Sequence, residues 1–282
     1  MTVDGSPALR FDGASVGYGG LPVVSDVSFT VPTGQVTVLV GPNGSGKSTL
    51  LRTVYGAGDL LAGTVLLDER DIRRFSPAQR AERIGVVVQD DTPPDGLTGE
   101  ELVGLGRYAR LRTFDRFGAG DRAAVSRAMD EAGCRDLAHT RIRELSGGQR
   151  QQLLFARALV NDPGILLLDE LTNHLDIRRQ LSMLTAVAAS GRTVLAVLHD
   201  LDLASAVADT VHVLADGHLV ASGPPKSALD DRVLAEVFGV RARRFPALHS
   251  TGNRLILDLV EWPGNAPQLS RQRYPTMEEE RP

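Results

Sequence analysis

The stretch GPNGSGKS, residues 41–48, constrains the fold of this chain more than any other. It follows QVTVLV at residues 35–40, whose β-branched residues predict a buried strand, and it leads into a helical pattern. Strand, glycine-rich loop and helix form the setting in which the pattern G-x-x-x-x-G-K-[ST] binds phosphate. The glycines let backbone N–H groups turn toward phosphate oxygens, and the start of the helix adds partial positive charge. The stretch therefore predicts a nucleotide-binding loop rather than a flexible glycine turn.

The basic residues single out Lys47. The chain has 31 lysines and arginines, and only Lys47 and Lys226 are lysines. A compact ammonium fits among phosphates where the planar guanidinium of arginine fits poorly. We expect Lys47 to reach the β- and γ-phosphates of ATP and the Ser48 hydroxyl to bind Mg²⁺.

Apolar strands alternate with helical patterns along the rest of the chain. The expected strands lie at 64–68, 84–89, 164–170 and 192–200, and helical patterns fill roughly 98–160. This alternation is typical of an α/β core with a largely parallel sheet, beside which the helical stretch forms an insertion.

The last third of the chain predicts smaller elements. Residues 210–223 indicate a hairpin around Asp216-Gly217, because this dipeptide favours a two-residue turn. A short helix and terminal strands are expected after it. We expect one domain over residues 1–260, with its core at about 8–90 and 161–240 and a helical subdomain at about 91–160. Residues 261–282 lack apolar periodicity and are expected to be disordered.

Two acids follow one of the apolar strands, in ILLLDE at residues 165–170. Asp169 would stand at the carboxyl edge of the sheet, where open α/β sheets bind ligands, and it suits Mg²⁺. Glu170 suits the activation of water. Alternatively, the two acids cap the next helix.

A second glycine-rich stretch, LSGGQ at residues 145–149, begins another amphipathic helical pattern. Ser146 is a suitable N-cap, and the two glycines leave backbone N–H groups accessible to an anion. Taken alone, the stretch fits a capped helix as well as an anion site. A chain that binds one nucleotide needs one phosphate loop, so the second loop requires an explanation.

The stretches GPNGSGKST, LSGGQ, ILLLDE and VLHD, in this order, resemble the nucleotide-binding subunit of ATP-binding-cassette (ABC) transporters over roughly residues 8–240. The resemblance implies a P-loop NTPase (RecA-like) core with a mostly parallel sheet, an N-terminal antiparallel β portion and an inserted α-helical subdomain. It also implies that two chains sandwich ATP and Mg²⁺ head to tail. The LSGGQ loop of one chain would then serve the nucleotide of the other, which explains the second loop.

The same resemblance assigns roles to single positions. Tyr18 would stack on adenine, Gln89 would contact Mg²⁺ and sense the γ-phosphate, and His199 would orient that phosphate and the attacking water. The plainer interpretations are packing for Tyr18, a polar strand end for Gln89 and ordinary hydrogen bonding for His199. The expected catalytic residues are Glu170, His199, Gln89 and Lys47, and the expected metal ligands are Ser48, Gln89 and Asp169. The expected ATP-binding residues are Tyr18, Gly41, Asn43, Gly44, Ser45, Gly46, Lys47, Ser48, Thr49, Ser146, Gly147, Gly148, Gln149 and Asp176.

Two positions depart from the family pattern. Leu171 stands where a proline is usual, and this change could loosen the turn that sets Glu170. Gln152 stands where an arginine is common.

The choice among cassette ATPases rests on further resemblances. Segments 97–111, 197–225 and 232–240 are similar to the importers of ferric siderophores, haem and cobalamin. We expect a subunit that joins a separate membrane permease at the inner face of the cell membrane, with a substrate-binding protein acting indirectly. Four residues before and within the first helical pattern fit either an apolar docking groove for the permease or a buried helix face: Leu97, Leu102, Val103 and Leu105.

The alternative is a non-transport ABC ATPase that acts on a ribosome or on DNA. No sustained heptad run lies between Lys47 and Leu145, and the formal net charge of −4 argues against nucleic acid as a partner. We see neither a signal peptide nor an apolar run long enough to span a membrane, so we expect a soluble protein. The single cysteine, Cys134, excludes an internal disulfide and is expected to be inert.

Overall fold

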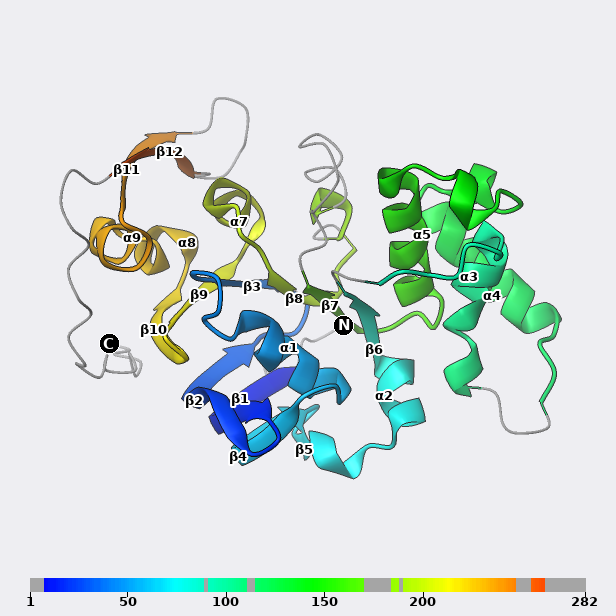
Figure 1. The fold of residues 1–282 in the computed structure, drawn as a ribbon, viewed down its shortest axis with the longest axis horizontal. Coiled ribbons are helices and arrows are strands. Elements are labelled where there is room, and N and C mark those ends of the chain that lie inside the picture. The colour runs from blue at the N-terminus through cyan, green and yellow to red at the C-terminus, as the bar shows by residue number, and fades with distance from the viewer. Residues whose placement is uncertain are drawn as a thin grey trace.

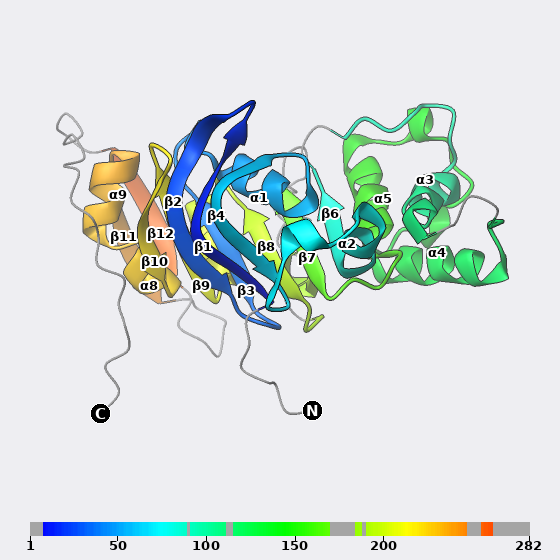
Figure 2. The same ribbon diagram turned by 90° about the horizontal axis from the view of Figure 1, so that it is seen from below.

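The computed structural model describes residues 8–88, 91–110, 115–169, 184–187, 190–246 and 255–261. Within these ranges, a central sheet and an N-terminal sheet enclose a helix, and a group of helices lies to one side (Figure 1). The view in Figure 2 places this group at one end of the molecule and the C-terminal helices at the other.

The central sheet has the strand order β10-β9-β3-β8-β7-β6. Its pairs are parallel except for β9 with β10, which form the expected hairpin. Every residue of β3, β7 and β8 is buried, as expected for strands covered on both faces. The strands are β3 (Val36–Val40), β6 (Ile84–Val87), β7 (Ile165–Asp169), β8 (Thr193–Val197), β9 (Thr210–Ala215) and β10 (His218–Gly223). The predicted α/β core with a mostly parallel sheet is confirmed.

The N-terminal sheet is antiparallel, in the order β2-β1-β4-β5. The strand expected at 64–68 belongs to this sheet and not to the parallel one. Helix α1 (Lys47–Tyr55) packs between the two sheets, where Leu50, Leu51 and Val54 are fully buried. The strands are β1 (Leu9–Tyr18), β2 (Leu21–Val31), β4 (Asp59–Leu67) and β5 (Arg70–Asp71).

The helical group contains α3 (Gly99–Leu105), α4 (Ala119–Glu131) and α5 (Gly147–Leu159). Capping boxes start α3 at Thr98 and α5 at Ser146, and they satisfy backbone N–H groups that no helical turn can reach. The shorter helical elements are η1 (Ile72–Arg74), which contacts β4, and α2 (Pro77–Arg83), η2 (Tyr108–Arg110), η3 (Arg135–Leu137) and η4 (Ile142–Glu144). The predicted helical insertion is present.

The C-terminal part consists of short helices and a second hairpin. Strands β11 (Val240–Pro246) and β12 (Leu255–Glu261) pair antiparallel. The helices are α7 (Leu201–Val207), α8 (Pro225–Ala228) and α9 (Asp231–Phe238). The expected tail, apart from Glu261 at the end of β12, lies outside the described residues. None of the helices in the described ranges combines the length and the apolar character that a membrane crossing needs.

Candidate active site

The candidate site lies where β3 passes into α1, at the carboxyl edge of the central sheet (Figure 1). Residues 41–46 form the connecting loop, and Lys47 is the first residue of the helix. Strand β7 ends at Asp169 on the same edge, because β3, β8 and β7 are parallel neighbours. The sheet therefore brings the glycine-rich loop and the predicted acid together.

Two glycines hold the loop against the surrounding strands. Gly41 has φ 152°, and a Cβ atom there would lie 2.0 Å from the carbonyl oxygen of Leu214 in β9. Gly46 has φ 96°, and its Cβ atom would lie 2.1 Å from a methyl carbon of Val24 in β2. Any side chain at either position would push the loop away from a sheet, so its path requires glycine.

The Lys47 side chain is buried beneath this loop. Its Nζ donates hydrogen bonds to the carbonyl oxygens of Gly41 at 2.9 Å and Pro42 at 2.8 Å, with the Ser45 hydroxyl at 3.4 Å. Helix α1 has no side-chain cap. Its first N–H groups and this ammonium together form a positive concave surface suited to an anion.

A pocket of about 410 Å³ opens over the loop. This volume lies within the range of roughly 300–1,000 Å³ that is usual for small-molecule sites. Its lining residues are Val23, Asn43, Gly44, Gly46, Lys47, Ser48, Thr49 and His199. His199 follows β8, so the structure brings this predicted residue to the phosphate loop, although it is distant in sequence.

Ser48, which lines this pocket, is hydrogen-bonded to Asp169. The Ser48 hydroxyl donates to Oδ1 of Asp169 at 2.7 Å, and the carboxylate has no exposed surface. A hydroxyl and a carboxylate are oxygen ligands of the kind that Mg²⁺ prefers. Among the described residues, no three His, Cys, Asp or Glu side chains cluster to hold a metal alone. The pair thus fits a cation that also binds phosphate oxygens and water.

Tyr18 ends β1, and its side chain is partly exposed. A hydrogen bond with its hydroxyl is the main reason why the pKa of Arg52 in α1 is raised. The charge of Asp169 also raises this pKa, whereas burial lowers it. Tyr18 therefore lies on the side of α1 that faces the acid.

The second glycine-rich stretch lies at the start of α5, in the helical group. The Ser146 hydroxyl accepts from the Gln149 N–H at 3.3 Å, and Gln149 Oε1 accepts from the Ser146 N–H at 3.0 Å. Ser146 and Gly147 are exposed, and none of LSGGQ lines the pocket over Lys47. Within one chain the stretch is a capped helix, and the structure does not bring the two glycine loops together.

A sequence profile described as "ABC transporter" matches residues 24–173, which is more than half of the chain. The chain belongs to the ABC transporter family. Its curated relatives include the ferric enterobactin transport ATP-binding protein FepC of Escherichia coli, 38% identical over 83% of this chain and 88% of the relative. They also include the hemin import ATP-binding protein HmuV of Rhodococcus jostii, 39% identical over 83% of this chain and 81% of the relative.

Solved structures agree with this assignment. An ABC transporter of the metal-chelate type, in an inward-facing conformation, is 25% identical with a TM-score of 0.77, over 90% of this chain and 98% of that chain. A dimeric bacterial ABC transporter cassette is 25% identical with a TM-score of 0.68, over 78% of this chain and 99% of that chain. As an ABC ATP-binding subunit, the chain is an ATPase with a P-loop fold.

Several expected positions of the cassette cannot be placed. Gln89, Glu170 and Asp176 lie outside the described residues, as does Leu171. Their roles remain predictions. The Cys134 thiol is buried, and burial raises its pKa to about 12, so it stays protonated and unreactive.

Sequence reasoning missed one charged residue of the site, Arg52. Its Nε lies 3.8 Å from Oδ2 of Asp169. A signal was present, because Arg52 follows Ser48 by four residues and such residues share one face of a helix. No motif includes this position, so only the packing of α1 against β7 reveals it.

Proposed function

We propose that this cassette hydrolyses ATP to drive the import of a ferric siderophore, or of haem or cobalamin, through a separate membrane permease. The observation that carries the catalytic part is that Lys47 and Ser48 line one pocket and that the Ser48 hydroxyl donates to the buried carboxylate of Asp169. The transport part is supported by the relatives, whose names describe transport of ferric enterobactin and import of hemin. Neither of these names describes action on a ribosome or on DNA.

In this proposal the residues of the site act by position and charge. Lys47 and the start of α1 hold the β- and γ-phosphates, while Tyr18 stacks on adenine. Ser48 and Asp169, with Gln89, would hold Mg²⁺, which would supply positive charge next to the phosphates. Glu170 accepts the proton of the attacking water, and His199, which lines the pocket, orients the γ-phosphate.

The complete site requires two copies of the chain. The LSGGQ loop is exposed at Ser146 and Gly147, and it lies away from the pocket of its own chain. In a head-to-tail dimer it would close over the ATP of the partner, and Asp176 would link the two sites. A dimeric cassette among the similar structures supports this arrangement.

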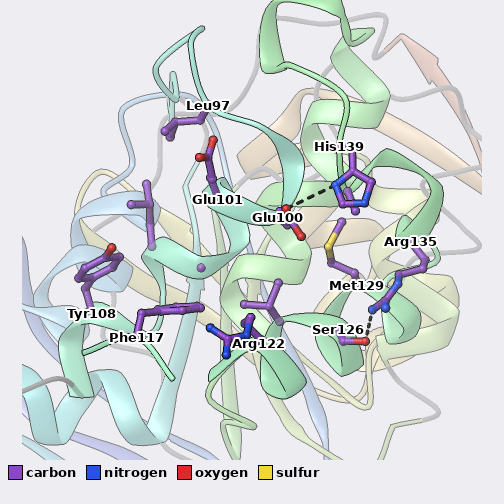
Figure 3. Close-up of a pocket in the computed structure, with 14 residues that line it drawn as sticks. Leu97, Glu100, Glu101, Tyr108, Phe117, Arg122, Ser126, Met129, Arg135 and His139 are labelled. Atoms are coloured by element: carbon purple, nitrogen blue, oxygen red, sulfur yellow. Dashed lines mark hydrogen bonds and ion pairs between the residues drawn. The ribbon is translucent and has the colours of Figure 1, made fainter. Parts of the chain in front are cut away.

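The helical group offers a surface that would suit the permease. A pocket of about 570 Å³ lies between α3 and α4, away from the nucleotide site (Figure 3). Leu105 and Tyr108 line it and are 40% and 58% exposed, and the Tyr108 and Phe117 rings lie 6.2 Å apart. Exposed apolar side chains in a concave surface favour a protein partner.

The four apolar residues considered from sequence separate into two groups. Leu102 and Val103 are fully buried in the core, so the buried helix face explains them. Leu97 and Leu105 line the pocket. Charged side chains also line this pocket. Among them, Glu100 Oε1 lies 3.4 Å from Nδ1 of His139 (Figure 3). An amphipathic segment of a permease would fit such a surface, and the subunit would then sit at the inner face of the membrane.

The test is to trap the assembly and identify its members. Tagged Glu170→Gln protein should bind ATP but turn it over about 10²–10⁴-fold more slowly, because the general base is lost. Detergent-solubilised membranes should then yield a multi-helix permease with the trapped protein. The Glu170→Gln/Lys47→Ala variant, which cannot hold ATP, is the matched control for nucleotide-dependent capture. Ribosomal proteins or nucleic acid, with no membrane protein, would overturn the transport proposal.

A second variant tests the surface. Leu105→Glu places a charge in the apolar part of the pocket and should reduce recovery of the permease while ATP binding stays unchanged. Leu61→Glu, at a similarly exposed leucine on β4, is the control and should recover the permease normally. Equal recovery with both variants would show that the permease binds elsewhere.

A further inference from the structure

Helix α1 presents two side chains to the buried carboxylate of Asp169. The Ser48 hydroxyl donates to Oδ1 at 2.7 Å, and Arg52 Nε lies 3.8 Å from Oδ2. The two residues are four apart, so they approach the carboxylate from the same face of the helix. The Asp169 side chain is 0% exposed, whereas that of Arg52 is 37% exposed. The guanidinium therefore stands between a buried negative charge and solvent.

The Tyr18 hydroxyl also interacts with Arg52. The pKa of its guanidinium is raised chiefly by the Tyr18 hydroxyl, with additional contributions from Asp169 and Tyr55 that act against burial. Arg52 thus lies between Tyr18, the residue proposed to stack on adenine, and Asp169, the residue proposed to bind Mg²⁺. The mechanism proposed above, which uses Lys47, Ser48 and His199, gives the Arg52 guanidinium no role.

We propose that Arg52 is a positioning residue of the nucleotide site: it neutralises Asp169 and keeps divalent cations off this carboxylate until the nucleotide binds. The inference rests on the proposed Mg²⁺ site at Ser48 and Asp169. A buried carboxylate is costly unless it is paired and hydrogen-bonded, and Arg52 and Ser48 supply a charge and a hydrogen bond. The carboxylate is therefore held in place without a metal.

The same cation sets the order of binding. A divalent ion beside Asp169 would lie within a few ångströms of the guanidinium, and the repulsion between them is strong in a partly buried site. The negative charge of a triphosphate offsets this repulsion. Metal therefore binds only together with ATP, and the nucleotide-free protein does not collect divalent ions at Asp169.

The test measures metal binding rather than hydrolysis. Mn²⁺, which substitutes for Mg²⁺ and has an electron paramagnetic resonance signal, is titrated into the full-length nucleotide-free protein. Arg52→Met should raise its affinity for Mn²⁺ by roughly tenfold or more, because a repelling charge is removed. Arg52→Lys keeps the charge and should bind Mn²⁺ as the wild type does. Arg127→Met removes the same charge from an exposed position on α4 and is the matched control.

Two further variants make the result decisive. Arg52→Met/Asp169→Asn should lose the gained affinity, which places the new site at Asp169. Arg52→Gln keeps hydrogen-bond donors but not the charge, and should reproduce the gain if Arg52→Met does not fold. Unchanged Mn²⁺ affinity in the folded charge-removing variant, or a gain that survives Asp169→Asn, would overturn the inference. If the wild type binds no Mn²⁺ even with ATP, the proposed metal site fails too.

Discussion

The two glycine-rich loops of this chain both contain serine and both lead into a helix, but their surroundings differ. In the loop before α1, Lys47 is buried and bonds the loop carbonyls, and the neighbouring Ser48 bonds Asp169 from another strand. In the loop before α5, the side chains of Ser146 and Gln149 each accept from the backbone N–H of the other residue, and Gly147 is exposed.

The difference shows which part of the site one chain can build. The loop at Lys47 is enclosed by two sheets and reaches an acid far away in sequence. The LSGGQ loop forms a capped helix start, and none of its residues lines the pocket over Lys47. We infer that the first loop binds nucleotide in the monomer and that the second acts only across a dimer.

Among the variants that test this difference between the loops, Lys47→Ala should have the largest effect on ATP binding and turnover. It removes the only lysine of the phosphate loop, so both ATP binding and turnover should fall, the latter by about 10³-fold or more. Fluorescence of a labelled ATP analogue measures binding, and phosphate release measures turnover. Lys226→Ala, at the other lysine, should change neither. Normal binding by Lys47→Ala would show that the enclosed loop is not the nucleotide site.

Gly147→Asp should distinguish the function of the LSGGQ loop from that of the loop at Lys47. An aspartate in the first turn suits the helix dipole, so the fold should be kept, but its charge would repel the phosphates of the partner's ATP. Nucleotide binding by the monomer should persist, whereas turnover should fall by about 10²-fold. Gly147→Ala controls for the added side chain.

Mixing this variant with Lys47→Ala sharpens the test, because mixed dimers contain one site with both loops intact. Activity should recover to as much as roughly a quarter of the wild type if the chains pair at random. No recovery, despite measured mixed dimers, would contradict the shared site.

His212→Leu should change stability without changing either loop. His212 is buried beside Phe29, with ring centroids 4.4 Å apart, and neither ring nitrogen makes a hydrogen bond of ordinary geometry. Burial lowers the pKa of the imidazole from 6.5 to about 4, which the backbone of Thr30 opposes only in part.

At a pH between these two pKa values, His212 is therefore protonated in the unfolded chain but neutral in the folded chain. The free energy of unfolding should fall by about 2 kcal/mol from this residue as the pH drops from 7.5 to 5. Denaturant unfolding at several pH values should show a flatter dependence for His212→Leu than for His218→Leu, which changes an exposed histidine of the same hairpin. Equal dependence in both variants would contradict the assignment.

Ser146→Ala should have the smallest effect on stability. It removes the acceptor that caps α5 and should lower the free energy of unfolding by about 1 kcal/mol. Binding of nucleotide at Lys47 should not change. Ser146→Thr keeps the acceptor and should retain the stability, and a loss of binding in Ser146→Ala would show that the two loops communicate within one chain.

Local patterns in the sequence determined much of this protein. The phosphate loop, the hairpin around Asp216-Gly217 and the start of α5 at Ser146 follow from residues that are near neighbours in the chain. Such features depend on φ preferences, on capping and on the spacing of apolar residues, all of which act over a few positions. The resemblance of the ordered motifs to ABC cassettes supplied the antiparallel N-terminal portion as well.

Only the tertiary structure decided the features that depend on which elements pack together. The strand expected at 64–68 joins the antiparallel sheet, although its apolar residues would suit either sheet. Leu102 is core while Leu105 lines a pocket, three residues away on the same helix. Arg52 reaches Asp169 because α1 lies against β7, a contact that no short motif encodes. Burial and long-range charge pairing are properties of the packed chain, so these assignments required its three-dimensional arrangement.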